Sequence, residues 1–215
     1  MISSTVTTTS TFPPSSADRP FVDGVDLSNG GAVRWCFTGR TQGDLSEAAP
    51  QAVTRLGETL GVPIHTVHQV HGDQVVVLGA DDVDPSGRAV SPHHADALVT
   101  SVCDVGLGVR TADCAPVVLW SDGATDGGVI GAAHGGWSGL EAGIVEATAE
   151  SMRSMGATHL SAVLGPCIGP ECYEFTDADL MALRDRARES VTNLGGEEHG
   201  AQRLADLDAG RATVF

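Results

Sequence analysis

Aromatic side chains are scarce in this 215-residue chain, at 4% of all residues. A core must therefore be built mainly from Val, Leu, Ile and Ala, and a chain of this length with 41% hydrophobic residues can bury one. Basic residues are also few: 12 Lys and Arg stand against 28 Asp and Glu, for a formal net charge of −16. Such a surface repels nucleic-acid phosphates and anionic lipid, so we expect neither nucleic-acid nor membrane partners.

The sequence also has no apolar run near the roughly 20 residues that cross a bilayer. Residues 1–20 are rich in Ser, Thr and Pro and lack the basic start and apolar stretch of a signal peptide, so we interpret them as a disordered leader. The five cysteines are odd in number and widely spaced, which is not the pattern of a disulfide framework. Reduced thiols in the cytoplasm are expected, and we predict that Cys167 and Cys172 are structural, space-filling thiols.

Short apolar runs bounded by Gly, Asp, Ser or Pro predict strands, and longer periodic segments predict helices. Strands are expected at residues 32–38, 74–78, 97–100, 105–109, 117–120, 129–133 and 160–164. Helices are expected at residues 50–60, 138–155 and 176–194, and a loop at 81–94. Ser138 and Glu141 match a capping box at the second helix. Strands outnumber helices without strict alternation, which predicts a single α/β domain over residues 21–215, a sandwich with a mixed β-sheet and flanking helices.

Three motifs place reactive side chains beside predicted strands: HQVHG at residues 68–72, TADCAP at 111–116 and AHGGWSG at 133–139. In TADCAP, Asp113 adjoins the thiol of Cys114, and a buried acid needs a partner such as a cation or metal. In AHGGWSG, Gly135 and Gly136 let a ligand approach the backbone before a helix N-terminus, which attracts anions. Each motif also has a structural interpretation, as an incidental surface loop, a small buried cysteine and a tight connection respectively.

Together the motifs supply His71, Cys114 and His134. Three protein ligands with an open fourth position are typical of catalytic zinc. The long separations along the chain mean that the fold must assemble such a site, so the spacing alone carries little weight.

Five blocks in order, HQVHG, ADALVT, TADCAPVVL, AAHGGWSGL and LGPCIGPECYEF, resemble the laccase-like multicopper polyphenol oxidoreductase family over residues 32–194. Proteins of this family are also described as zinc-dependent purine nucleoside phosphorylases with adenosine deaminase activity, and as peptidoglycan editing factors. The resemblance implies a zinc or copper site on His71, Cys114 and His134. It implies phosphorolysis of adenosine, inosine and S-methyl-5'-thioadenosine, and deamination of adenosine. It also places Arg40, in the segment FTGR, in the substrate pocket, where its guanidinium would hold phosphate.

For such an enzyme we expect catalytic roles for Cys114, Asp113 and Arg40, with Asp113 or a group behind the metal ligands moving protons. Phosphate binding is expected at Arg40 and at the backbone amides of Gly135 and Gly136. The chain departs from the family pattern at residues 41–50, which are short and acidic, and at its end, which lacks the family's Ser-x-Arg-Arg-Asp type of segment. We interpret it as a fragment or a C-terminally shortened variant.

Four other functions stay open on these residues. One is a metal-free hydrolase with Cys114 as nucleophile and His71 or His134 as its base. The others are a peptidoglycan-precursor editing factor, a catalytically impaired metal-binding module and a copper-dependent phenol oxidase. The oxidase is disfavoured because eight His, with three in the motifs, are few for several copper clusters. The sequence leaves the oligomeric state open.

Overall fold

The computed structural model describes residues 2–7, 21–27, 31–84, 90–121, 128–169, 171–174, 176 and 181. The chain divides into two compact units, residues 1–167 and residues 168–215, where the sequence predicts one domain over residues 21–215. The helices and strands β1 to β11 and α1 to α3 all lie in the first unit. The predicted helix at 176–194 lies almost wholly outside the described residues. None of the helices in the described segments is long and apolar enough to span a membrane.

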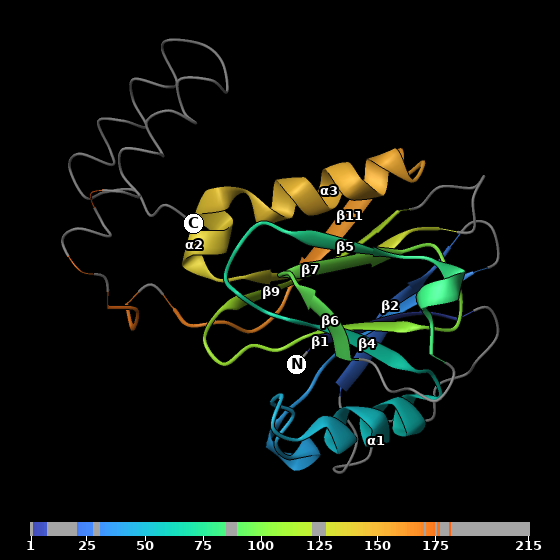
Figure 1. The fold of residues 1–215 in the computed structure, drawn as a ribbon, viewed down its shortest axis with the longest axis horizontal. Coiled ribbons are helices and arrows are strands. Elements are labelled where there is room, and N and C mark those ends of the chain that lie inside the picture. The colour runs from blue at the N-terminus through green and yellow to red at the C-terminus, as the bar shows by residue number, and fades with distance from the viewer. Residues whose placement is uncertain are drawn as a thin grey trace, which may run out of the picture. The chain divides into compact units, whose positions relative to one another are not determined.

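Two mixed sheets form the body of the first unit (Figure 1). The six-stranded sheet has the order β2 (Phe21–Asp26), β3 (Ala32–Phe37), β1 (Ile2–Thr7), β8 (Gly106–Val109), β4 (Ile64–His68), β6 (Val90–His94). The five-stranded sheet has the order β11 (Leu160–Leu164), β9 (Ala115–Ser121), β10 (Ile130–Gly135), β7 (Ala97–Thr100), β5 (Val75–Leu78). The pairs β8–β4, β4–β6 and β7–β5 are parallel, and the other pairs are antiparallel.

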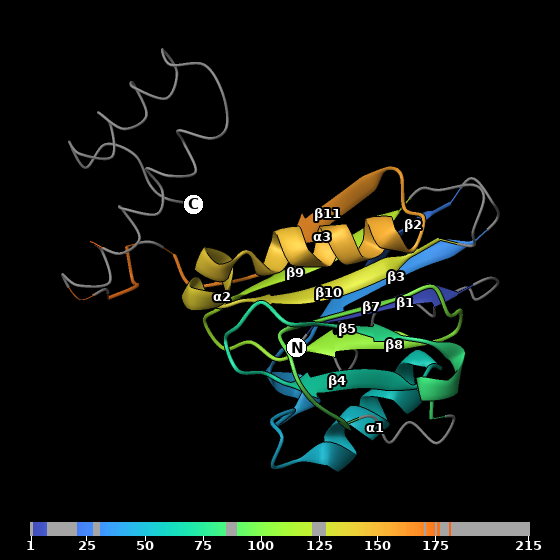
Figure 2. The ribbon, with the colours of Figure 1, turned by 45° about the horizontal axis from the view of Figure 1, so that its top comes forward.

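The two sheets pack face to face around one apolar cluster. Trp35 of β3 stacks on Trp120 of β9 with ring centroids 5.0 Å apart, and Leu107 and Leu98 from opposite sheets are fully buried in the same cluster. Helix α3 (Ile144–Ser154) covers the outer face of the five-stranded sheet, and α1 (Pro50–Leu60) covers that of the six-stranded sheet (Figure 2). The predicted α/β sandwich with mixed sheets and flanking helices is confirmed.

Most predicted elements form where expected, and the exceptions have physical causes. Residues 2–7, placed in a leader by composition, form β1 between β3 and β8, because the Ile, Thr and Val of ISSTVT favour a strand. The predicted loop at 81–94 contains a short 3₁₀ helix, η2 (Ala80–Asp82), and β6. Strand β4 was not predicted, because its sequence IHTVH has only two apolar residues; its polar His65 and Thr66 are buried here, and His68 is exposed. A second 3₁₀ helix, η1, spans Arg40–Gln42.

The helix predicted at 138–155 is two helices, α2 (Trp137–Ala142) and α3, separated at Gly143, which has φ +94°. A left-handed residue ends one helix and redirects the chain into the next. The residue before α2 is Gly136, and no side chain caps it, so the predicted capping box at Ser138 is wrong.

Candidate metal centre

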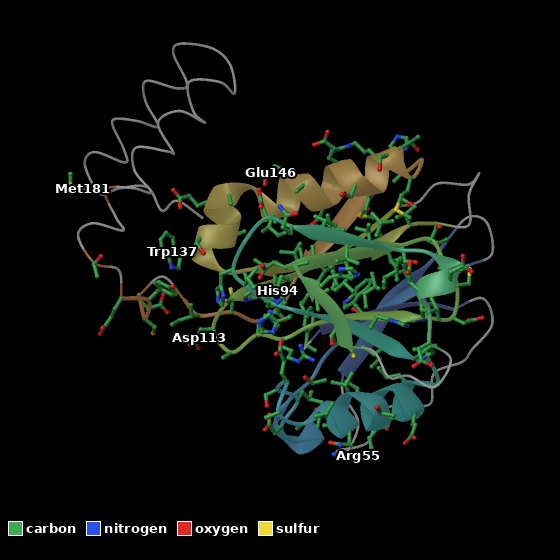
Figure 3. The ribbon with its side chains drawn as sticks, in the orientation of Figure 1. Arg55, His94, Asp113, Trp137, Glu146 and Met181 are labelled. Carbon is green, nitrogen blue, oxygen red and sulfur yellow. The ribbon has the colours of Figure 1, made fainter. Side chains whose placement is uncertain are left out.

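His71, Cys114 and His134 come together at one end of the two sheets. His71 follows β4, Cys114 immediately precedes β9, and His134 lies in β10. One potential ligand atom from each lies within 4.8 Å of the others, and Cys114 Sγ is 3.9 Å from His71 Nε2. The two imidazole rings meet edge to face with centroids 4.7 Å apart. The labelled neighbours Asp113 and Trp137 lie toward the same end of the sheets in Figure 3.

The donor set fits a borderline transition metal. Two imidazoles and one thiolate suit zinc or copper, and hard cations such as Mg²⁺ prefer oxygen ligands. Three protein donors leave a coordination position for a substrate or water. The burial of the three residues is graded: His134 is buried, Cys114 is intermediate and His71 is exposed, so the open side faces solvent.

Asp96, which the sequence analysis did not single out, holds this centre together. Its carboxylate is fully buried and accepts the Nδ1–H of His134 at 2.8 Å. It also accepts three backbone N–H groups, from Val70 at 3.2 Å, His71 at 2.9 Å and Gly72 at 2.8 Å. Because Nδ1 of His134 donates to Asp96, the lone pair on Nε2 is directed to the metal site, as in carboxylate–histidine–metal triads.

Two pKa shifts describe the electrostatics of the centre. Burial opposes ionisation of Asp96, but the hydrogen bonds from His134, Gly72, Val70 and His71 outweigh it, and the pKa of Asp96 is lowered. Burial, followed by the charges of Asp113 and Asp96, raises the pKa of the Cys114 thiol. A thiolate at this position therefore needs a nearby cation, which a metal supplies.

Backbone geometry shapes the loop that carries His71. This residue has φ +60°, a left-handed conformation uncommon outside glycine, and its N–H is held by Asp96. On the other side, Ser138 Oγ donates to the carbonyl of His71 at 2.8 Å. A Cβ on Gly136 would lie 2.6 Å from Cδ2 of His71, so only glycine permits this approach of the α2 start to the ligand ring. Ser138 thus binds the ligand loop and does not cap its own helix.

A second set of hydrogen bonds ties the His71 loop to the loop that leads to Cys114. Gln69 Oε1 accepts the N–H of Arg110 and Gln69 Nε2 donates to its carbonyl, both at 2.7 Å. The guanidinium of Arg110 donates to the carbonyls of Leu45 and Val67 and to Thr66 Oγ1. Sequence motifs alone did not indicate this clamp, because it pairs a side chain with backbone 41 residues away.

The predictions for the remaining site residues agree with the structure only in part. Asp113 is exposed, so it is not the buried acid inferred from TADCAP, and that role belongs to Asp96. Gly135 ends β10 and Gly136 follows it, beside the metal ligands. The side chain of Arg40 lies outside the described residues. Cys167 and Cys172 are free and exposed, so they do not fill space as predicted.

Fold and site together define an α/β sandwich protein with a His–Cys–His centre for a transition metal. The chain belongs to the family described as multi-copper polyphenol oxidoreductase laccase, whose sequence model matches residues 31–214. A purine nucleoside phosphorylase of Xylella fastidiosa is 42% identical over 134 residues, 61% of this chain and 49% of the relative. An adenosine deaminase from an unknown prokaryotic organism is 34% identical over 138 residues, 60% of this chain and 51% of the relative. The chain spans about half the length of these relatives.

Solved structures agree with this fold. A Neisseria meningitidis protein superposes with a TM-score of 0.54 at 29% identity, covering 80% of this chain and 69% of that protein. YlmD from Geobacillus stearothermophilus superposes with a TM-score of 0.55 at 24% identity, covering 81% of this chain and 70% of that protein. This likeness supports the fold alone.

Proposed function

We propose that this protein is a zinc-dependent purine nucleoside phosphorylase that also deaminates adenosine, acting in the cytoplasm on adenosine, inosine and S-methyl-5'-thioadenosine. The observation that carries the proposal is the three-donor centre of His71, Cys114 and His134, with His134 oriented by Asp96. The names of the relatives support the substrate class. Copper is the second candidate for the metal.

In phosphorolysis a phosphate oxygen forms a bond to C1′ of the sugar while the bond from C1′ to the base breaks, which gives the free base and the sugar 1-phosphate. In deamination adenosine and water give inosine and ammonia. Zinc held by the three ligands supplies Lewis acidity for activating water or polarising the base. Asp96 keeps Nε2 of His134 available as a ligand, and its hydrogen bond to the His71 N–H fixes the loop that carries the other imidazole.

Proton transfer is assigned to Asp113, which is exposed beside Cys114 and can exchange protons with solvent. Phosphate binding is assigned to Arg40, with backbone groups at Gly135 and Gly136 as the second candidate. Helix α2 has six residues, and so short a helix adds little dipole, which makes the Arg40 guanidinium the stronger of the two.

The raised pKa of Cys114 argues against a metal-free cysteine hydrolase. Nucleophilic cysteines carry a lowered pKa, whereas burial and the charges of Asp113 and Asp96 raise this one. Copper-dependent phenol oxidation needs several clustered copper sites. Within the described ranges there is one group of three or more potential metal ligands, which disfavours this function.

The test is the metal content of the purified protein, followed by a nucleoside panel with and without phosphate. We expect about one zinc per chain, as for a three-ligand site, with phosphate-dependent release of free base and phosphate-independent formation of inosine. Cys114→Ala should lose the zinc and both activities. Cys103→Ala, which changes an exposed cysteine outside the centre, is the matched control.

Turnover by a zinc-free wild-type protein, or by Cys114→Ala without metal, would contradict the proposal. A folded, zinc-loaded protein that turns over none of these nucleosides would leave a metal-binding module as the function.

A further inference from the structure

A second histidine cluster lies outside the His71–Cys114–His134 centre. It consists of His68, at the end of β4, His94, at the end of β6, and Glu47, in the loop before α1. The two imidazole rings have centroids 4.7 Å apart and are tilted by 48°. His94 is labelled in Figure 3, on the strand nearest the viewer. The function proposed above uses none of these three residues.

Glu47 fixes the orientation of His68. Its two carboxylate oxygens lie 3.0 and 2.8 Å from Nδ1 of His68, so Nδ1 carries the proton and Nε2 carries the lone pair. This is the arrangement that Asp96 imposes on His134. In metal sites a carboxylate on one ring nitrogen raises the basicity of the other, which then binds the ion.

The carboxylate is itself held in place. Arg110 NH1 lies 3.6 Å from Glu47 Oε1, and Arg110 Nε donates to the carbonyl of Leu45 in the same loop. The side chain of Arg110 is 13% exposed, whereas those of His68 and Glu47 are 47% and 42% exposed. A largely buried guanidinium therefore anchors a carboxylate whose imidazole partner faces solvent.

An irregularity in the sheet places His94 opposite His68. Thr66 pairs with Val90 and His68 pairs with His94, so β6 advances four residues while β4 advances two. Adjacent strands lie about 4.8 Å apart, and bulges of this kind redirect side chains next to functional sites. The N–H of Ala95 donates to the carbonyl of His68 at 3.0 Å, which holds the two strand ends together beyond the irregularity.

We propose that His68 and His94 form a second, solvent-facing metal site for a borderline divalent cation such as Zn²⁺ or Cu²⁺, with Glu47 as the residue that positions His68. Imidazole nitrogens are suited to these ions, and water completes the coordination. With two protein ligands the site is weaker than the three-donor centre, and an ion bound there is exchangeable. The site does not depend on the nucleoside activity or on metal binding at Cys114.

The experiment is a Zn²⁺ titration of the full-length protein by calorimetry. The wild type should take up two equivalents of different affinity, and Cys114→Ala should lose the tighter one and keep the weaker. His68→Gln and His94→Gln should each lose the weaker equivalent and keep the tighter. Glu47→Gln should weaken it about 10–100-fold, the usual effect of removing a carboxylate that orients a ligand.

His159→Gln is the matched control, because His159 is an exposed histidine before β11 whose ring contacts Thr158 and, within the described ranges, no second imidazole. Electron paramagnetic resonance of Cys114→Ala with one equivalent of Cu²⁺ should show coupling to imidazole nitrogen, and His94→Gln added to that background should reduce it. Circular dichroism of each variant reports on folding. Because His68 and His94 are both exposed and lie on different strands, one variant can still test the site if the other fails to fold.

A wild type that binds a single equivalent, which Cys114→Ala abolishes, overturns the proposal. A weaker equivalent that survives in both His68→Gln and His94→Gln does the same, because the ion is then bound elsewhere. A wild-type single equivalent that survives in Cys114→Ala and is lost in His68→Gln and His94→Gln would instead refute the metal centre at Cys114 and leave this site intact. The two failures are therefore distinguishable.

Discussion

Replacing Asp96 with Asn is the sharpest test of the metal centre, because the change removes one charge and almost no volume. The two carboxylate oxygens divide the four hydrogen bonds evenly. Oδ1 accepts from His134 Nδ1 and the His71 N–H, and Oδ2 accepts from the N–H groups of Val70 and Gly72. Whichever oxygen becomes the amide nitrogen, two N–H donors lose their acceptor and face another donor.

The size of the effect follows from those two bonds. A hydrogen bond to a charged group contributes about 1.5–3 kcal/mol, so two of them amount to about 3–6 kcal/mol, divided between folding and metal binding. We expect zinc affinity to fall about 10–100-fold, as for other changes beside metal-binding histidines. The free energy of unfolding of the metal-free protein should fall as well, because the same bonds hold the His71 loop before any ion binds.

The assay has two parts, namely zinc competition against a chromophoric chelator and urea unfolding of the metal-free protein. Asp113→Asn is the control. Asp113 is exposed beside Cys114, and this substitution also removes one negative charge but leaves the hydrogen bond between Asp96 and His134 in place. Wild-type zinc affinity in Asp96→Asn would refute the reasoning. An equal loss in Asp113→Asn would show that general charge near the thiol matters, and the specific hydrogen bonds do not.

Three further predictions address geometry, phosphate binding and pH. Gly136→Ala should weaken zinc binding by about 1–3 kcal/mol, the usual cost of overpacking, because the new Cβ would lie 2.6 Å from the ring of His71. Competition against a chromophoric chelator measures this loss of zinc affinity. Arg40→Ala should reduce phosphorolysis about 10–100-fold, the value of a charged hydrogen bond, and deamination much less, because water replaces phosphate there; both rates are compared in one preparation. His65 is 3% exposed, and no described residue offers a hydrogen-bond partner to its Nε2. Burial lowers its pKa against the opposing charges of Asp84 and Asp82. The unfolded chain therefore binds a proton near pH 6.5 that the folded chain does not, and unfolding free energy should fall below that pH by at most about 1.4 kcal/mol per pH unit, less steeply in His65→Leu.

Each of these three has a result that contradicts it. Unchanged zinc affinity in Gly136→Ala would mean that the His71 ring moves freely. Equal losses of both activities in Arg40→Ala would indicate general damage, and an unchanged phosphate dependence would remove Arg40 from the site. If the unfolding free energies of the wild type and His65→Leu changed with pH in parallel, the buried histidine would not be the cause of the acid destabilisation. His159→Gln serves as the control at an exposed histidine.

How far the sequence predicts this molecule depends on the range of the interactions involved. Helix α1 was predicted with its bounds, because Pro50 and Gly61 act locally, the first at the helix start and the second by adopting φ +80° after its end. The ligand motifs were found because His71, Cys114 and His134 are chemically distinctive.

Residues that act through tertiary partners were missed. Asp96 is a single acid at the start of an apolar strand, and its four donors come from two distant segments. Strand β6 was predicted as a loop because its sequence VSPHH is mostly polar and contains Pro92, which argues against a strand. The break at Gly143 was missed because isolated glycines are tolerated within helical patterns.

The hydrogen bonds around Asp96 and Gln69 all join protein atoms to protein atoms. The loops that carry His71 and Cys114 are therefore ordered when the chain folds, and the conformational entropy of those loops is lost at that stage and not when a ligand arrives. An ion entering this centre finds its donors already arranged, so exchange of one metal for another requires little movement of the backbone. Selection between borderline metals at such a centre then depends on metal supply and on the fixed geometry of the donors, and not on a rearrangement of the protein.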